Sequence, residues 1–312
     1  MTPKEIKAKA EYLSLSEFSV LSKIAVQFLP RGRVHGLVGI TAYLVCIAQL
    51  FSIPLYFTSQ YLEDQTFGPI IVLKALCKAF IGGELFDFTS FSWFTETVFI
   101  LFQIFTWMTM IFFGILIFLV VKGIKVPPLF NTIWSNTCYL YPLVFAFPIF
   151  SFHLKLCYSI THGRIALWSE VIESDAQEIL IMILSIVAII WSLVFTGVTL
   201  IFSSNQLKMK DPLTAKSKLQ LFFNFAEKVS LYLIFQLFPE SNTKIWCLFL
   251  LNSGLTLIRL IHSYTFPFYK IRIMHIELIF CSLQFFLAAL NLLGWILCHA
   301  DSTITQDRKS VV

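Results

Sequence analysis

Charged residues are scarce in this sequence. They make up 13% of its 312 residues, about half of the share found in ordinary soluble domains. Hydrophobic residues make up 57%, and phenylalanine alone occurs 34 times. So little charge is typical of a chain that lies in a membrane, and the composition therefore argues against a soluble globular domain.

Motifs for catalysis and metal binding are also lacking. The seven cysteines have no paired spacing, and no two of the six histidines stand three or four residues apart. No CxxC or HExxH pattern occurs, although such spacings are what brings metal ligands together. We therefore expect no catalytic residue, no cofactor, no metal site and no enzymatic activity.

The sequence is rich in long apolar stretches. A helix needs about 20 apolar residues to cross a hydrocarbon core of about 30 Å. Seven stretches of the required length are present: residues 34–57, 93–121, 129–154, 178–202, 219–238, 244–263 and 273–299. They predict an all-α fold, a polytopic transmembrane bundle over residues 34–299, with a short polar tail at 300–312.

One further apolar segment, Phe67 to Phe86, is interrupted by Lys74 and Lys78. Residues four apart share one face of a helix, so both ammonium groups would lie on the same side. This pattern favours an interfacial or re-entrant helix. An eighth full span at this place is the alternative topology.

The distribution of basic residues predicts the orientation. With the N-terminus in the cytoplasm, the inner segments hold fourteen of the 23 lysines and arginines, as expected from the positive-inside rule. Residues 1–33 contain Lys4, Lys9 and Lys23 among apolar residues, so they do not form the apolar core of a secretory signal. We interpret them as a cytoplasmic amphipathic segment at the inner leaflet.

Four ionisable residues fall inside the predicted spans: Glu227, Lys228, Arg259 and Glu277. A charge at the centre of a membrane helix costs roughly 2.5 to 3.5 kcal/mol on insertion scales, so such residues are candidate functional groups. Counted from the cytoplasmic ends, Arg259 and Glu277 are about 6 Å deep and the other two about 12 to 14 Å deep.

The depths of these charges suggest partners. Arg259 and Glu277 lie on consecutive antiparallel spans at matching depth, so an ion pair between them is expected, with snorkelling of Arg259 to the interface as the alternative. Glu227 and Lys228 point about 100° apart on one helix and should meet different partners. The polar residues available to them are Asn224, Gln236, Asn252 and Gln284.

The third span contains two prolines, Pro142 and Pro148. Proline lacks a backbone N–H and therefore frees a carbonyl one turn earlier in the helix. A freed carbonyl inside the membrane needs a partner or must line a cavity. We expect this span to be kinked.

The second half of the chain carries short motifs that stand in order. The loop Lys210–Ser217, with Asp211, Pro212 and Lys216, precedes the span that holds Glu227 and Lys228, and the turn Tyr264–Lys270 follows the next span. These motifs, with the Phe- and Pro-rich Tyr139–Cys157 region, resemble the membrane region of the tiny macrocysts B-like proteins of ciliates and slime moulds. The resemblance implies a membrane module that larger relatives join to further membrane helices and to PAS sensor or helical repeat regions, of which residues 300–312 bear no trace.

These observations leave two function classes. The leading interpretation is a non-enzymatic sensor-type or scaffold-type membrane module that acts through helix packing and partners. The alternative is a transporter or channel that uses Glu227 and Lys228 beside the kinked third span. The expected partners are the lipid bilayer and either another protein or further copies of the chain, and no nucleic acid.

Overall fold

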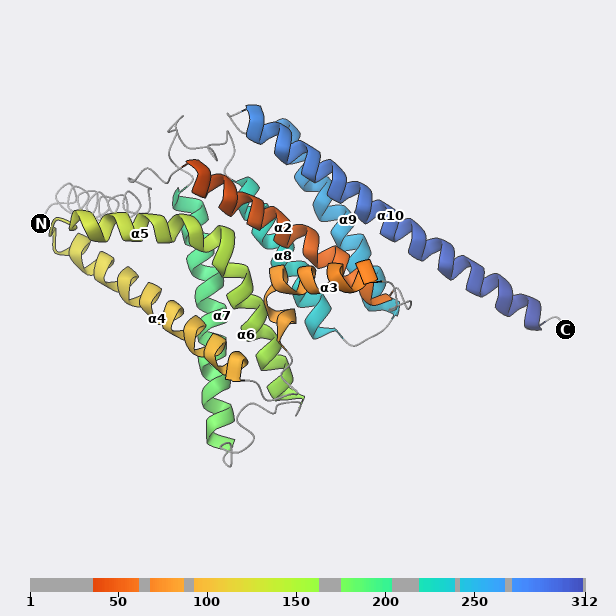
Figure 1. Cartoon of the computed structure of the whole chain (residues 1–312), viewed down its shortest axis with the longest axis horizontal. Coiled ribbons are helices and arrows are strands. Elements are labelled where there is room, and N and C mark those ends of the chain that lie inside the picture. Colours follow the sequence, from red (N-terminus) through yellow and green to blue (C-terminus); the bar gives the residue numbers. More distant parts are fainter. Residues whose placement is uncertain are drawn as a thin grey trace, which may run out of the picture.

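The computed structural model describes residues 36–61, 68–86, 93–162, 175–203, 219–238, 242–266 and 271–310. All regular structure in these ranges is helical, which confirms the predicted all-α class (Figure 1). The elements in chain order are α2 (Gly36–Tyr61), α3 (Gly68–Ile81), the short 3-10 helix η1 (Gly83–Leu85), α4 (Trp93–Val121), α5 (Pro128–Leu140), the π-helix η2 (Tyr141–Phe145), α6 (Ala146–Thr161), α7 (Asp175–Ser203), α8 (Leu219–Leu237), α9 (Asn242–Thr265) and α10 (Ile271–Ser310).

Within the described ranges, six helices are long and apolar enough to cross a membrane, one fewer than the seven expected spans. The chain is thus a multi-pass helical membrane protein. The remaining expected span, 219–238, does form a helix, α8, but Asn224, Glu227 and Lys228 lower its apolar character. Figure 1 shows α8 running from the end of the bundle where α7 finishes to the end where α9 begins.

The helices that surround the bundle carry their apolar side chains outward. On α4, Leu101, Ile104 and Ile111 are each more than half exposed, whereas Gln103 and Thr106 on the same helix are buried. In water, so many exposed apolar groups would favour aggregation. In a bilayer the same surface contacts lipid, and the polar side chains face the protein interior, where the Gln103 amide nitrogen donates to the Leu184 carbonyl at 3.2 Å.

Helix α3 is too short to be a span. Its 14 residues extend about 21 Å, less than the hydrocarbon thickness of about 30 Å. It packs against α2, and the turn that follows it reaches α6. Figure 1 shows α2 ending and α4 starting toward the same end of the bundle. An eighth full span does not fit a helix of this length, and α3 with η1 (Gly68–Leu85) is called the hairpin below.

Two glycines allow the tip of the hairpin to approach α6. Gly82 has a φ of 81°, in the left-handed region that favours glycine. A Cβ on Gly82 would lie 2.8 Å from Cβ of Pro148, and one on Gly83 would lie 2.5 Å from the backbone oxygen of Ser151. The Ser151 hydroxyl also donates to the Ile81 carbonyl at 2.6 Å and accepts the Gly83 N–H at 3.0 Å. Glycine is therefore required where the hairpin turns inside the bundle.

The predicted kink is present in the third span. Pro142 lies in the π-helix η2, and Pro148 follows in α6. Figure 1 shows α5 and α6 meeting at a sharp angle across η2. Helix α6 continues to Thr161, beyond the predicted end at residue 154.

The last helix extends into the predicted tail. The predicted polar tail at 300–312 is not separate from the last span, because α10 continues as helix to Ser310. Adding residues to an existing helix costs little compared with starting one, and no glycine or proline occurs between residues 300 and 310 to stop it. The predicted amphipathic segment 1–33 lies outside the described residues.

The close approach at Gly83 predicts a strong effect of one added methyl group. Gly83→Ala should lower the free energy of unfolding by about 1 to 3 kcal/mol, since the Cβ overlaps the Ser151 backbone. Thermal unfolding of the purified protein in detergent measures this loss. Gly114→Ala on α4 is the matched control, because nothing lies within 4 Å of the added Cβ; equal melting temperatures for the two variants would contradict the packing.

Candidate functional site

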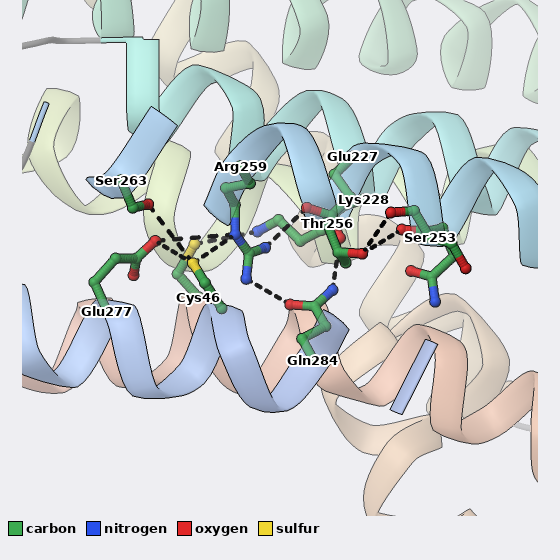
Figure 2. Close-up of polar contacts among 11 residues, drawn as sticks. Cys46, Glu227, Lys228, Ser253, Thr256, Arg259, Ser263, Glu277 and Gln284 are labelled. Carbon is green, nitrogen blue, oxygen red and sulfur yellow. Dashed lines mark hydrogen bonds and ion pairs between the residues drawn. The ribbon is translucent and has the colours of Figure 1, made fainter. Parts of the chain in front are cut away.

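Three helices contribute to a buried ionic cluster centred on Arg259. Nη1 of Arg259 on α9 donates to Oε2 of Glu227 on α8 at 2.8 Å, and Nη2 donates to Oε1 of Gln284 on α10 at 2.6 Å. The Gln284 amide nitrogen in turn donates to the other Glu227 oxygen at 2.5 Å. These three side chains therefore close a ring of hydrogen bonds that joins α8, α9 and α10 (Figure 2).

A second carboxylate lies on the other side of Arg259. Oε1 of Glu277 is 3.9 Å from the Arg259 Nε, and Cys281 lies between the two groups. The Arg259 Nε donates to the Cys281 sulfur at 3.2 Å, and the Cys281 thiol donates to Glu277 at 3.2 Å. The expected ion pair between Arg259 and Glu277 is present, but Glu227 makes the shorter contact.

The sequence explains why α10 supplies this side of the cluster. Glu277, Cys281 and Gln284 follow each other at intervals of four and three residues, so they share one face of the helix. A short link joins α9 and α10, which places this face against α9. Arg259 is only 2% exposed, so its side chain does not snorkel to the interface.

Lys228 has a different set of partners. Its Nζ donates to Oε1 of Gln49 on α2 at 2.8 Å, lies 3.6 Å from the Cys46 sulfur and stands 5.4 Å from the centre of the Phe147 ring. Glu227 and Lys228 thus meet different partners, as their angular separation predicted. Among the described residues, no carboxylate lies within ion-pair distance of the Lys228 ammonium.

The contact with Gln49 links Lys228 to the proline kink. The Gln49 amide nitrogen donates to the Val144 carbonyl at 3.0 Å. Val144 stands four residues before Pro148, so its carbonyl is the one that proline leaves without a helical partner. Sequence reasoning required such a partner and did not identify Gln49.

A second buried cluster lies at the hairpin. Glu84 of η1 accepts hydrogen bonds from Tyr232 on α8 at 2.9 Å, from Tyr56 on α2 at 3.1 Å and from Lys155 on α6 at 3.2 Å. Glu84 is 7% exposed and the Lys155 side chain 20%. The sequence analysis did not identify Glu84 as a site residue. The pair of glycines directly before it is the signal that could have indicated a turn inside the protein.

Of the four polar residues proposed as partners, Gln284 is the one that makes a hydrogen bond to Glu227 among the described residues. Asn224 and Asn252 are buried, and within the described part of the chain neither amide makes a side-chain hydrogen bond. Gln236 is half-buried near the end of α8. Asn224 is therefore a polar group placed deep in the bundle beside Glu227 and Lys228 with hydrogen-bonding capacity to spare.

Metal ligands do not gather in the parts of the chain that the structure describes. No group of three or more histidine, cysteine, aspartate or glutamate side chains is placed there to hold an ion. The ionisable groups of the two clusters are instead matched with amides, hydroxyls, thiols and one another. What this arrangement can do chemically is to hold charge and to exchange protons.

The ion pair between Glu227 and Arg259 predicts that substitutions of these two residues have non-additive effects on the free energy of unfolding. Glu227→Gln should lower the free energy of unfolding by about 3 to 5 kcal/mol, because it leaves the buried guanidinium without its closest charge. Arg259→Met should have an effect of similar size, and combining it with Glu227→Gln should cost clearly less than the sum of the two.

Thermal unfolding in detergent measures all three variants. Glu178→Gln, at an exposed position on α7, is the matched control and should leave stability unchanged. Strictly additive losses would show that the two charges do not interact.

The comparisons with known proteins identify no family. No family model matches the chain, and neither a curated protein nor a solved structure does. The resemblance to the tiny macrocysts B-like proteins stays a prediction, and its loop residues Asp211, Pro212 and Lys216 lie outside the described residues.

Proposed function

We propose that this protein is a transporter, an integral membrane protein that moves an ion across the bilayer without covalent chemistry. The observation that carries the proposal is Lys228, which is fully buried in the bundle and whose direct contacts among the described residues are neutral groups. Ionisable residues in membrane helices are costly, and they commonly mark the path of an ion or substrate.

The surroundings of Lys228 support this proposal. The π-helix η2 and the turn of the hairpin are both interruptions of regular helix within the bundle. Irregular backbone at membrane depth is tolerated where protein buries it or where it lines a wet cavity, and broken helices are common at transporter sites. The η2 carbonyl of Val144 is joined to Lys228 through Gln49, so the break and the charge belong to one hydrogen-bonded unit.

We also propose an orientation, with the N-terminus in the cytoplasm. It rests on the fourteen of 23 basic residues that fall on the inner side. Helices α2 and α6 then run outward, as does α8. In this orientation Lys155, on the last turns of α6, stands toward the outer face and the start of α8 stands toward the inner face.

A sensor-type or scaffold-type module is the second candidate, and the Arg259 ring favours it. Nε, Nη1 and Nη2 of Arg259 each have a partner, which is what a permanent clamp between α8, α9 and α10 requires. This class is also the one that the family resemblance implies. It predicts that neutralising Lys228 changes stability alone, because nothing passes through the bundle.

Transport can be tested in liposomes that contain the purified full-length chain. Fluxes of protons, sodium, potassium and chloride are measured one by one against liposomes without protein. At least one ion should cross faster with the protein present, and Lys228→Met should reduce that flux to the background.

Lys125→Met is the matched control, because Lys125 is exposed in the link between α4 and α5. Background fluxes of all four ions with correctly folded protein would contradict the transporter proposal and favour the scaffold class.

A further inference from the structure

Two groups of buried polar side chains, Lys228 with Gln49 and the Glu84 cluster, lie along one face of α8. Asn224, Lys228 and Tyr232 follow each other at intervals of four residues, so they occupy the same side of the helix over about 12 Å. All three are fully buried. Lys228 belongs to the cluster with Gln49, and Tyr232 donates to Glu84 of the hairpin cluster.

One aromatic ring contacts both groups of side chains. Phe147 of α6 packs edge to face on Tyr232, with ring centres 5.8 Å apart, and the same ring lies 5.4 Å from the Lys228 ammonium. Lys228 and Tyr232 are a single helical turn apart, about 5.4 Å to 6 Å along the axis. The Phe147 ring therefore borders both the Lys228 ammonium and the Tyr232 ring.

The series of polar groups continues toward both ends of the bundle. On one side, Glu84 receives the Lys155 ammonium, whose side chain is 20% exposed. On the other side, Asn224 lies about 8 Å from the start of α8. Its amide nitrogen and oxygen both lack hydrogen-bond partners among the described residues, so they are available to hold a passing water or hydronium.

The chemistry of the groups identifies the ion. The Lys228 ammonium donates to Gln49 and lies near the Cys46 sulfur and the Phe147 ring, while the adjacent Glu227 is held by Arg259 and Gln284. No carboxylate among the described residues pairs with this ammonium, so its loss of a proton breaks no ion pair. An ammonium can release a proton, but it offers no acceptor to a metal cation.

We propose that the transported ion is the proton, and that Lys228 and Glu84 are the two groups that carry it past Phe147. This inference rests on the transporter proposal. The Lys228 ammonium releases a proton that reaches the Glu84 carboxylate by way of the Tyr232 hydroxyl, which donates to that carboxylate. The neutral amine then takes a proton from the Asn224 side, and Glu84 releases its proton toward Lys155. One proton crosses, and every group returns to its starting charge.

The test uses the full-length chain in liposomes of phosphatidylcholine and phosphatidylglycerol that enclose a pH-sensitive dye. A pH gradient is imposed while valinomycin and potassium hold the membrane potential, and the initial rate of acidification is recorded. Protein-containing liposomes should acidify well above the background of empty ones. Sodium and chloride fluxes are measured on the same preparations.

Three variants separate a proton carrier from a structural cation. Lys228→Arg keeps the positive charge, but a guanidinium does not release its proton, so proton flux should fall to background. Glu84→Gln should do the same. Tyr232→Phe keeps the ring that packs on Phe147 and removes only the hydroxyl, so flux should fall several-fold while the melting temperature changes little.

The outcomes decide between the proposals. Proton flux that persists at the wild-type rate in folded Lys228→Arg overturns the inference. If that variant does not fold, Tyr232→Phe at the wild-type rate overturns it instead. Sodium or chloride flux without proton flux also overturns it but leaves the transporter proposal in place. The absence of all fluxes overturns both, and Lys125→Met should retain the full proton flux.

Discussion

Inside a bilayer, a polar group can satisfy its hydrogen bonds only within the protein, because the hydrocarbon offers neither donor nor acceptor. This constraint orders the interior of the molecule. The guanidinium of Arg259 gathers one residue from α8 and three from α10, and Glu84 gathers side chains from α2, α6 and α8. Apolar packing alone distinguishes poorly between one helix neighbour and another when lipid is equally apolar. The polar contacts specify which helices meet and at what depth.

The same constraint explains where the backbone departs from regular helix. Pro148 frees the Val144 carbonyl, and the Gln49 amide compensates from α2. The hairpin leaves the helical conformation at Gly82, and the Ser151 hydroxyl compensates from α6 by accepting the Gly83 N–H and donating to Ile81. Each irregularity therefore has a named side chain on a neighbouring helix that satisfies it. Because Gln49 also accepts a hydrogen bond from Lys228, a change in the kink that moved Gln49 would alter the contact with this buried cation.

Sequence reasoning reached the parts of this arrangement that depend on one helix at a time. Apolar length predicted the spans, most closely at α4, whose bounds Trp93–Val121 agree with the expected 93–121. The matching depth of Arg259 and Glu277 predicted their pairing, because a short link fixes two antiparallel helices relative to each other. The order in which distant helices pack could not be obtained in this way. Gln284 was among the polar residues proposed as partners and contacts Glu227, whereas no local signal tied Gln49 on α2 to Lys228.

Glu84 was missed for a related reason. An acidic residue after a short apolar segment has the same local pattern whether it lies in a solvated loop or at the turn of a hairpin inside the bundle. What separates the two is the close approach of α6, which is visible at Gly82 and Gly83 only once Pro148 and Ser151 are in place. In the folded chain the hairpin brings a carboxylate against Tyr232, on the face of α8 that carries Lys228 one turn earlier.

Arg259 and Lys228 consequently differ in kind. Arg259 keeps its charge at all accessible pH values, and its position between Glu227 and Glu277 gives it two carboxylates. Lys228 is compact, can lose its proton, and is surrounded by an amide, a thiol and an aromatic ring. On adjacent positions of α8, one residue therefore anchors the helix to a permanent charge while the next one holds a proton that it is able to give up. A helix built only for packing would need the first feature and would gain nothing from the second, and this asymmetry is the physical reason for proposing a transporter with Lys228 on its central helix.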